Sequence, residues 1–208
     1  MTLLKIILKN EVFPALGCTE PTAVAYAASI AAEKLDGPVE KVRIIVDPGV
    51  FKNGMAVTVP NTGGEHGNLI AGVIGALIGQ PDRKMKILEG ANAEIIDRAK
   101  TLIAHDQALV ECDNSQLGLR IDVTVSNSQG SARAVMQQNH TNLVLLEKDG
   151  ETLIAKQEED LTRLPDYKDV LREMTIAELV DTAEQMDAED EAYIREGITM
   201  NQKIAAEG

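Results

Sequence analysis

A cysteine stands directly before a segment that is typical of a helix start. Residues 17–21 read Gly-Cys-Thr-Glu-Pro, and Thr19 is a good N-cap with Glu20 and a proline in the first turn. The unpaired N–H groups and the positive end of the helix dipole would favour a thiolate at Cys18, and they would also hold a carboxylate. The segment could thus provide an activated sulfur beside an anion site. Glu20 competes for the same positive field, and the simpler alternative is that Thr19 and Glu20 only cap the helix while Cys18 is packed.

A glycine-rich loop in residues 60–67, Pro-Asn-Thr-Gly-Gly-Glu-His-Gly, should lead into another helix. Such a loop can hold an anion through its backbone N–H groups. It matches neither the Walker pattern nor the dinucleotide-binding pattern. His66 could act as a general base, but a capping or solvent-exposed role is the commoner one for such a histidine.

Two more polar clusters could line a ligand site. Residues 139–142 read Asn-His-Thr-Asn and fall between two expected strands, while residues 52–54 read Lys-Asn-Gly and follow a Pro-Gly turn. Their side chains are all hydrogen-bonding groups. The simpler alternatives are a polar turn for the first cluster and a surface loop for the second.

The composition excludes several classes of protein. The formal net charge is -13 and there are 0 Trp, 3 Tyr and 2 Phe, so the chain lacks both the cations and the stacking rings of nucleic-acid binders. We therefore do not expect nucleic acid as a partner. We do not expect a membrane either, since the longest apolar run, residues 69–78, is about 10 residues long, which is too short for a membrane span. Lys5 and Lys9 interrupt any signal peptide. Two cysteines, Cys18 and Cys112, make no disulfide framework, and we expect a cytoplasmic protein.

The periodicity of apolar residues predicts an α+β fold, in which helices pack on an antiparallel sheet and a helical segment follows. An alanine-rich helix should run from Thr19 to about Leu35, and a helix over 65–78 has one face almost without side chains, which should meet a neighbouring backbone. The further elements are a helix ending near 13–14, a strand over 42–46, a helix around 95–103, a strand over 109–112, and an antiparallel meander over 118–126, 130–138, 142–148 and 151–155.

A change in charge predicts a boundary near Lys156. Residues 157–208 hold 15 of the 33 acidic residues but only 5 of the 20 basic ones, and apolar residues there recur at helical spacing. We therefore expect an α+β domain over 1–156 and an acidic helical segment over 157–208.

The run Pro-Ala-Leu-Gly-Cys-Thr-Glu-Pro in residues 14–21 resembles the signature near the N-terminus of the iron–sulphur L-cysteine desulfidase family, which is similar to the iron-dependent L-serine dehydratases. Other segments resemble that family in the same order. They are residues 51–57, 59–63 with 71–79, 140–142, Asn201 and 207–208. The chain departs from the family pattern at Asn61, where the loop usually has Gly, and at His66, which the family usually lacks although the serine dehydratases carry a His in a similar loop.

The resemblance implies a lyase without pyridoxal phosphate that acts in amino-acid catabolism. It β-eliminates L-cysteine to pyruvate, ammonia and sulfide, or L-serine to pyruvate, ammonia and water. Cys18 would be the catalytic base or, alternatively, a displaceable ligand of the cluster. Thr19 and nearby N–H groups would hold the substrate carboxylate. The implied substrate-binding residues are Thr19, Glu20, Lys52, Asn53, Thr62, Gly63, His140, Thr141 and Asn142.

Members of that family are about twice this length, and their helical second half carries the ligands of a 4Fe-4S cluster. Those ligands are absent from this chain, because its two cysteines are fewer than a cluster needs. The resemblance implies the N-terminal half of such an enzyme, inactive by itself and partnered by a missing C-terminal half or a separate subunit. Uncovered apolar helix faces would also favour a homodimer. The alternative function is a non-catalytic amino-acid-binding module or regulatory domain.

Overall fold

The computed structural model describes residues 2–156 and 166–207, which fall into two compact units. One unit comprises residues 15–156, and the other combines residues 2–14 with residues 166–207. The N-terminal helix α1 (Leu3–Glu11) belongs to the second unit. Its residue Glu11 accepts a hydrogen bond from Tyr167 Oη and forms an ion pair with Lys168 Nζ. The division near Lys156 therefore lies where the charge changes, and the first helix groups with the acidic helices.

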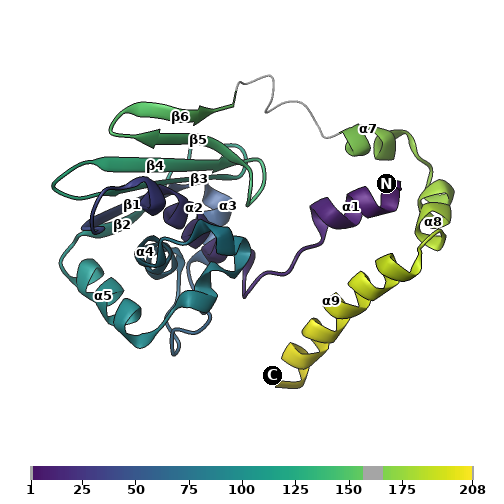
Figure 1. The fold of residues 1–208 in the computed structure, drawn as a ribbon, viewed down its shortest axis with the longest axis horizontal. Helices are drawn as coiled ribbons and strands as arrows, with labels where there is room; N and C mark the ends of the chain where they lie inside the picture. Colours follow the sequence, from purple (N-terminus) through teal and green to yellow (C-terminus); the bar gives the residue numbers. More distant parts are fainter. Residues whose placement is uncertain (1, 157–165, 208) are drawn as a thin grey trace. The chain divides into compact units, whose positions relative to one another are not determined.

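A six-stranded sheet forms the centre of the larger unit, with the order β2-β1-β3-β4-β5-β6 (Figure 1). Its strands are β1 (Lys41–Val46), β2 (Ala108–Cys112), β3 (Arg120–Ser126), β4 (Ser131–Gln137), β5 (Leu143–Lys148) and β6 (Glu151–Ala155). Strands β3 to β6 form the expected antiparallel meander. Strand β1 pairs antiparallel with β3, but β2 runs parallel to β1, so the sheet is mixed. The α+β fold is confirmed, and the antiparallel sheet that the sequence predicts gains one parallel strand, β2, at its edge.

The parallel pair has a physical reason in the length of the connection. Between β1 and β2 the chain passes through α3 (Pro48–Gly54), α4 (Asn68–Ile78), η1 (Pro81–Gly90) and α5 (Ala93–Ala104). A crossover of this length can return the chain to the starting end of the sheet, whereas short turns produce antiparallel neighbours. Asp149 and Gly150 form such a short turn between β5 and β6, with φ of 51° and 83°, as the Asp-Gly hairpin signal predicts.

Helices α2 (Thr19–Lys34) and α4 pack together against one face of the sheet (Figure 1). The alternation in β3 turns Ile121, Val123 and Val125 into this core, and each is 0% exposed. A Cβ on Gly75 would lie 2.1 Å from the carbonyl oxygen of Ala25. The small face of α4 therefore meets the backbone of α2, as predicted.

Two local features differ from the sequence expectation. Helix α4 begins at Asn68 rather than Glu65, because His66 pairs with Thr58 in an isolated bridge and Gly67 has a φ of 102°. Helix α3 is a short helix in a segment that the sequence indicated as a turn and surface loop.

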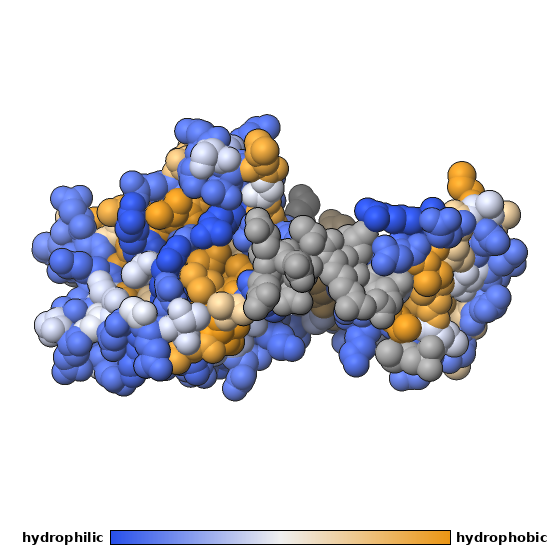
Figure 2. Space-filling model, turned by 90° about the horizontal axis from the view of Figure 1, so that it is seen from above, coloured by the Kyte–Doolittle hydropathy of each residue, from blue (hydrophilic) through white to orange (hydrophobic). Residues whose placement is uncertain are grey.

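The second unit contains α1, α7 (Asp166–Glu173), α8 (Ile176–Glu184) and α9 (Ala188–Glu207). Lys5 of α1 pairs with Asp187 at 2.8 Å and with Glu189 at 2.5 Å. Apolar side chains remain uncovered among the charged ones, most of all Ile176 and Ile204, which are 81% and 69% exposed. Hydrophobic patches surrounded by hydrophilic residues are visible on the face of each unit drawn in Figure 2. Within the described ranges, 2–156 and 166–207, no helix has the length and apolar character needed to cross a membrane.

Candidate functional site

A buried carboxylate fixes the junction of β1, α3 and β3. Asp47 follows β1 directly and caps α3, where its Oδ1 accepts hydrogen bonds from the N–H groups of Gly49 and Val50 at 2.8 and 3.2 Å. Its Oδ2 accepts from the N–H of Arg120 at 2.9 Å. One side chain thereby satisfies three backbone donors and joins a helix start to two strands.

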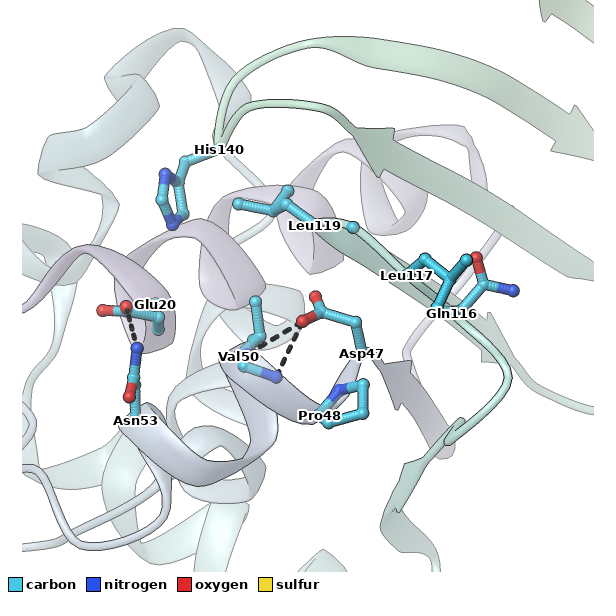
Figure 3. A pocket seen from close by; sticks show the side chains of 11 residues that line it. Glu20, Asp47, Pro48, Val50, Asn53, Gln116, Leu117, Leu119 and His140 are labelled. Atoms are coloured by element: carbon cyan, nitrogen blue, oxygen red, sulfur yellow. Dashed lines mark hydrogen bonds between the residues drawn. The ribbon is translucent and has the colours of Figure 1, made fainter.

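Beside this junction lies a pocket of about 490 Å³, entirely within the larger unit (Figure 3). Its walls come from the first turn of α2, the β1–α3 junction, the segment before β3 and the turn after β4. The lining residues are Glu20, Asp47, Pro48, Gly49, Val50, Asn53, Gln116, Leu117, Gly118, Leu119 and His140. Segments far apart in the sequence thus contribute to one hollow.

Glu20 is the central polar group on one side of the pocket. Its Oε1 accepts a hydrogen bond from Asn53 Nδ2 at 3.0 Å, and its Oε2 accepts one from the Cys18 thiol, also at 3.0 Å. Burial alone would raise the pKa of Glu20, but the hydrogen bonds from Cys18 and Asn53 lower it, and the net shift is downward. Glu20 is therefore a carboxylate at neutral pH.

Cys18 occupies the N-cap position of α2, one residue before the expected cap Thr19, which is the first helical residue. Burial raises the pKa of the Cys18 thiol, and the hydrogen bond to the Glu20 carboxylate raises it further. The N–H groups of Thr19 and Glu20 act in the opposite direction without outweighing them. The helix end thus acts on the thiol in the expected direction, but burial and the hydrogen bond to Glu20 outweigh it. Cys18 touches the pocket residue Glu20 but does not itself line the pocket.

His140 completes the pocket from the turn between β4 and β5. Its ring lies on the same side of the pocket as Glu20 and Asn53 (Figure 3). Burial lowers the pKa of His140, while the carboxylates of Glu20 and Asp47 partly oppose that shift. The imidazole is therefore neutral at physiological pH, when one ring nitrogen can accept a proton and the other can donate a hydrogen bond.

Neighbours of His140 in the sequence are engaged elsewhere. The N–H and Oγ1 of Thr141 donate to Asn139 Oδ1, and Asn142 donates to the carbonyl of Gln137 and accepts from Lys156. Thr141 and Asn142 do not line the pocket. They behave as the polar turn that was the simpler alternative.

Residues of the glycine-rich loop and Lys52 also lie outside the pocket lining. Thr62 is buried and donates to the carbonyl of Val59 at 2.6 Å while accepting from the N–H of Glu65, so its hydroxyl shapes the loop. Gly63 has a φ of 73° and open space around it, and Lys52 is exposed on α3. His66 is exposed, with Nε2 3.1 Å from Thr58 Oγ1.

The loop nevertheless contacts the cysteine segment. Gly17 has a φ of 82°, and a Cβ there would lie 2.4 Å from Pro60 Cγ. Only glycine adopts this conformation at this distance without strain. Residues 17–21 and 60–67 are therefore neighbours, although only the first segment reaches the pocket.

This chain is similar to UPF0597 proteins. It is 47% identical over 210 residues to one from Geobacter sulfurreducens, covering 100% of this chain and 49% of the relative. It is 41% identical over 212 residues to one from Elusimicrobium minutum (100% and 49%) and 40% identical over 202 residues to one from Clostridium tetani (97% and 48%). The chain spans about half the length of the curated relatives it matches. No protein-family model matches it, and neither does any solved structure.

Asp47 and the segment 116–119 are pocket residues that the sequence reasoning missed. The available signal was Asp47 followed by a proline, since an N-cap Asp with Pro at the first helical position indicates a helix start. The same residues also fit a turn that ends the strand over 42–46, which is the structure the sequence analysis predicts for them. Nothing in the residue types of 116–119 indicates a site.

The side chains of the described ranges do not fit an iron–sulphur cluster. They contain no group of three His, Cys, Asp or Glu that could hold a metal ion. Cys18 donates to Glu20, and Cys112 donates to Asn114 Oδ1 at 3.5 Å. The chemistry that these residues offer is a carboxylate, an amide, a neutral imidazole and a thiol around one hollow.

Proposed function

We propose that this chain is the substrate-binding part of a pyridoxal-phosphate-independent lyase that β-eliminates L-cysteine or L-serine. One observation carries the proposal. Glu20, Asn53 and His140 belong to three separate segments that resemble the desulfidase family, and they line one pocket. The Cys18 thiol lies one hydrogen bond away, on Glu20.

The reaction sets the tasks of such a pocket. A base removes the proton from the α-carbon, the C–S bond breaks with its electron pair on sulfur, and the resulting aminoacrylate takes up water. L-cysteine and water thus give pyruvate, ammonia and hydrogen sulfide. We assign to this chain the binding of the amino acid and the transfer of the α-proton, because it offers general acid–base groups at the pocket.

Two side chains are candidates for that base. The neutral His140 lines the pocket directly. Cys18 would act only after its own proton has passed to Glu20 or to solvent, since its pKa is raised. The cluster that the resemblance implies would belong to the part of a double-length protein that this chain does not align with. The exposed apolar side chains of the second unit would provide its contact, or the contact of a homodimer.

The test is pyruvate formation from L-cysteine and from L-serine. This chain would be combined with the unmatched part of a double-length relative, reconstituted with iron and sulfide, and compared with the chain alone. We expect pyruvate from the combination and none from the chain alone. Cys18→Ala and His140→Gln should each reduce turnover, and Cys112→Ala, outside the pocket, should not. Full turnover in both the Cys18→Ala and the His140→Gln variant would rule out the proposed roles, and no pyruvate from any combination would rule out the lyase.

A non-catalytic amino-acid-binding module is the second candidate. The observation that favours it is the protonated Cys18, which has a raised pKa and stands outside the pocket lining. Free cysteines in both positions agree with a cytoplasmic protein in either case. Calorimetric binding of L-serine or L-cysteine, together with no pyruvate from the combined protein, would support the module over the enzyme.

A further inference from the structure

The charged side chains that line the pocket all have the same sign. Among residues 2–156 and 166–207, the charged residues that line it are the acids Glu20 and Asp47, with neither lysine nor arginine. The third titratable group, His140, has a lowered pKa and is neutral at physiological pH. The charged side chains of the lining therefore favour a cationic group of a ligand over an anionic one.

The two acids have different capacities for a ligand. Asp47 already accepts from three backbone N–H groups, so its oxygens serve the junction of β1, α3 and β3. Glu20 accepts one hydrogen bond on each oxygen, and a carboxylate oxygen has two lone-pair positions. Glu20 therefore retains acceptor capacity on the side that faces the pocket.

The start of α2 is a poor seat for the carboxylate of a ligand. Glu20 is in the first turn of that helix, and the hydrogen bond from its own N–H contributes to lowering the pKa of its carboxylate. A second carboxylate placed there would be repelled by Glu20, and like charges a few ångströms apart are unfavourable in a partly buried site. The sequence-based expectation of an anion seat at this helix end thus meets a competitor that belongs to the chain itself.

We propose that Glu20 binds the ammonium group of the pocket's ligand, with Asn53 holding the carboxylate of Glu20 in place, so that a ligand enters with its cationic end toward α2. The identity of the ligand as an amino acid rests on the proposed function. The preference for an ammonium group rests on the pocket alone. Glu20 is thereby the residue that distinguishes amino acids from the corresponding acids without an amino group.

The experiment is calorimetry on the 208-residue chain at pH 7.5 with three probes. L-serine carries both groups, ethanolamine carries the ammonium without the carboxylate, and 3-hydroxypropionate carries the carboxylate without the ammonium. We expect the wild-type chain to bind L-serine and ethanolamine more tightly than 3-hydroxypropionate. Glu20→Gln should weaken the binding of both ammonium-bearing probes by about tenfold or more, the usual effect of losing a charge-assisted hydrogen bond.

Glu94→Gln is the matched control. Glu94 is also the second residue of its helix, α5, but it is exposed and lies outside the pocket. It should leave the binding of all three probes unchanged. Glu20→Asp keeps the charge and should keep the preference for ammonium over carboxylate, which guards against a Glu20→Gln variant that folds poorly. The thermal midpoint of each variant reports on folding.

Three results would overturn the inference. They are unchanged ethanolamine binding in a folded Glu20→Gln variant, tighter binding of 3-hydroxypropionate than of ethanolamine, and no binding of either ammonium-bearing probe to the wild type. The outcome is separable from that of the lyase proposal. Glu20-dependent ethanolamine binding without pyruvate formation would reject only the lyase, whereas pyruvate formation with Glu20-independent binding would reject only this role of Glu20.

Discussion

The thiol of Cys18 donates a hydrogen bond to Glu20 Oε2 at 3.0 Å, across two residues at the start of α2. The contact links the two residues of the cysteine segment that carry titratable side chains. It keeps the proton on sulfur and the charge on the carboxylate, because the pKa of Cys18 is raised while that of Glu20 is lowered. The reactivity of the cysteine therefore depends on its acidic neighbour.

Replacing Glu20 should make Cys18 more reactive. In a Cys112→Ser background, Cys18 is the only remaining cysteine, and Glu20→Gln removes both the charged acceptor and the neighbouring negative charge. The pKa of the thiol should fall, so that more thiolate is present at a given pH. We expect iodoacetamide to alkylate Cys18 several-fold faster at pH 7.5, as measured by intact-protein mass spectrometry. An unchanged or slower rate, relative to a Glu94→Gln control, would contradict the linkage.

The close approach of α2 and α4 gives a second prediction. A Cβ at position 75 would lie 2.1 Å from the carbonyl oxygen of Ala25, and backbone atoms cannot rotate away as a side chain does. Gly75→Ala should therefore destabilise the larger unit by about 1–3 kcal/mol or more. Gly197→Ala is the matched substitution in α9, where nothing lies within 4 Å, and it should stabilise that helix by about 0.5–1 kcal/mol. Urea unfolding monitored by circular dichroism measures both, and a harmless Gly75→Ala would show that the helices can separate.

Asp47 gives a third prediction, about the frame of the pocket. Asp47→Ala removes the cap of α3 and leaves the N–H of Arg120 without its acceptor, and together these losses should cost about 2–4 kcal/mol. Asn92 caps α5 with a single hydrogen bond to the N–H of Ile95, so Asn92→Ala should cost about 1 kcal/mol. Equal losses in the two variants would show that Asp47 is only an ordinary cap.

The sequence predicted most of the sheet because its signals are local. The alternation of Ile121 with Asp122 and the Asp-Gly turn at 149–150 are contained in a few neighbouring residues, and they fix the meander and a hairpin. Helix α3 was not predicted because its seven residues are too few to show a 3.6-residue period. The parallel pairing of β1 with β2 was not predicted because a pairing across a long crossover leaves no local pattern in the sequence.

The site was predicted in part for a similar reason. The resemblance implied a substrate-binding role for Glu20, Asn53 and His140, and these side chains line one pocket. Thr62 and Asn142 have equally suitable side chains, but these side chains donate hydrogen bonds to nearby backbone carbonyl groups. Whether a polar side chain is satisfied locally or points into a hollow depends on the turn that carries it, which residue type alone does not reveal.

His140 makes the stability of the larger unit depend on pH in a predictable direction. Burial lowers the pKa of its ring below the ordinary value of 6.5, so the unfolded chain binds a proton more readily than the folded one. The contribution of His140 to the free energy of unfolding is fully present above pH 6.5. It decreases as the pH falls from 6.5 to the lower pKa of the ring in the folded chain. Neither Cys18 nor Glu20 produces this effect in that window. The pKa of Cys18 is raised above its ordinary 9.0, and Glu20, with a pKa lowered from 4.5, protonates only in more acidic solution.

His140→Gln should therefore flatten the decline. We expect the wild-type chain to lose more of its urea midpoint between pH 7.5 and pH 5.5 than the variant does, because the variant has no ring to protonate. His105→Gln, at the exposed end of α5 and outside the pocket, controls for the loss of a histidine as such. If the wild type and His140→Gln decline in parallel while His105→Gln does not differ from them, the ring of His140 is not held neutral by its surroundings, and its assignment as a base of the pocket fails with it.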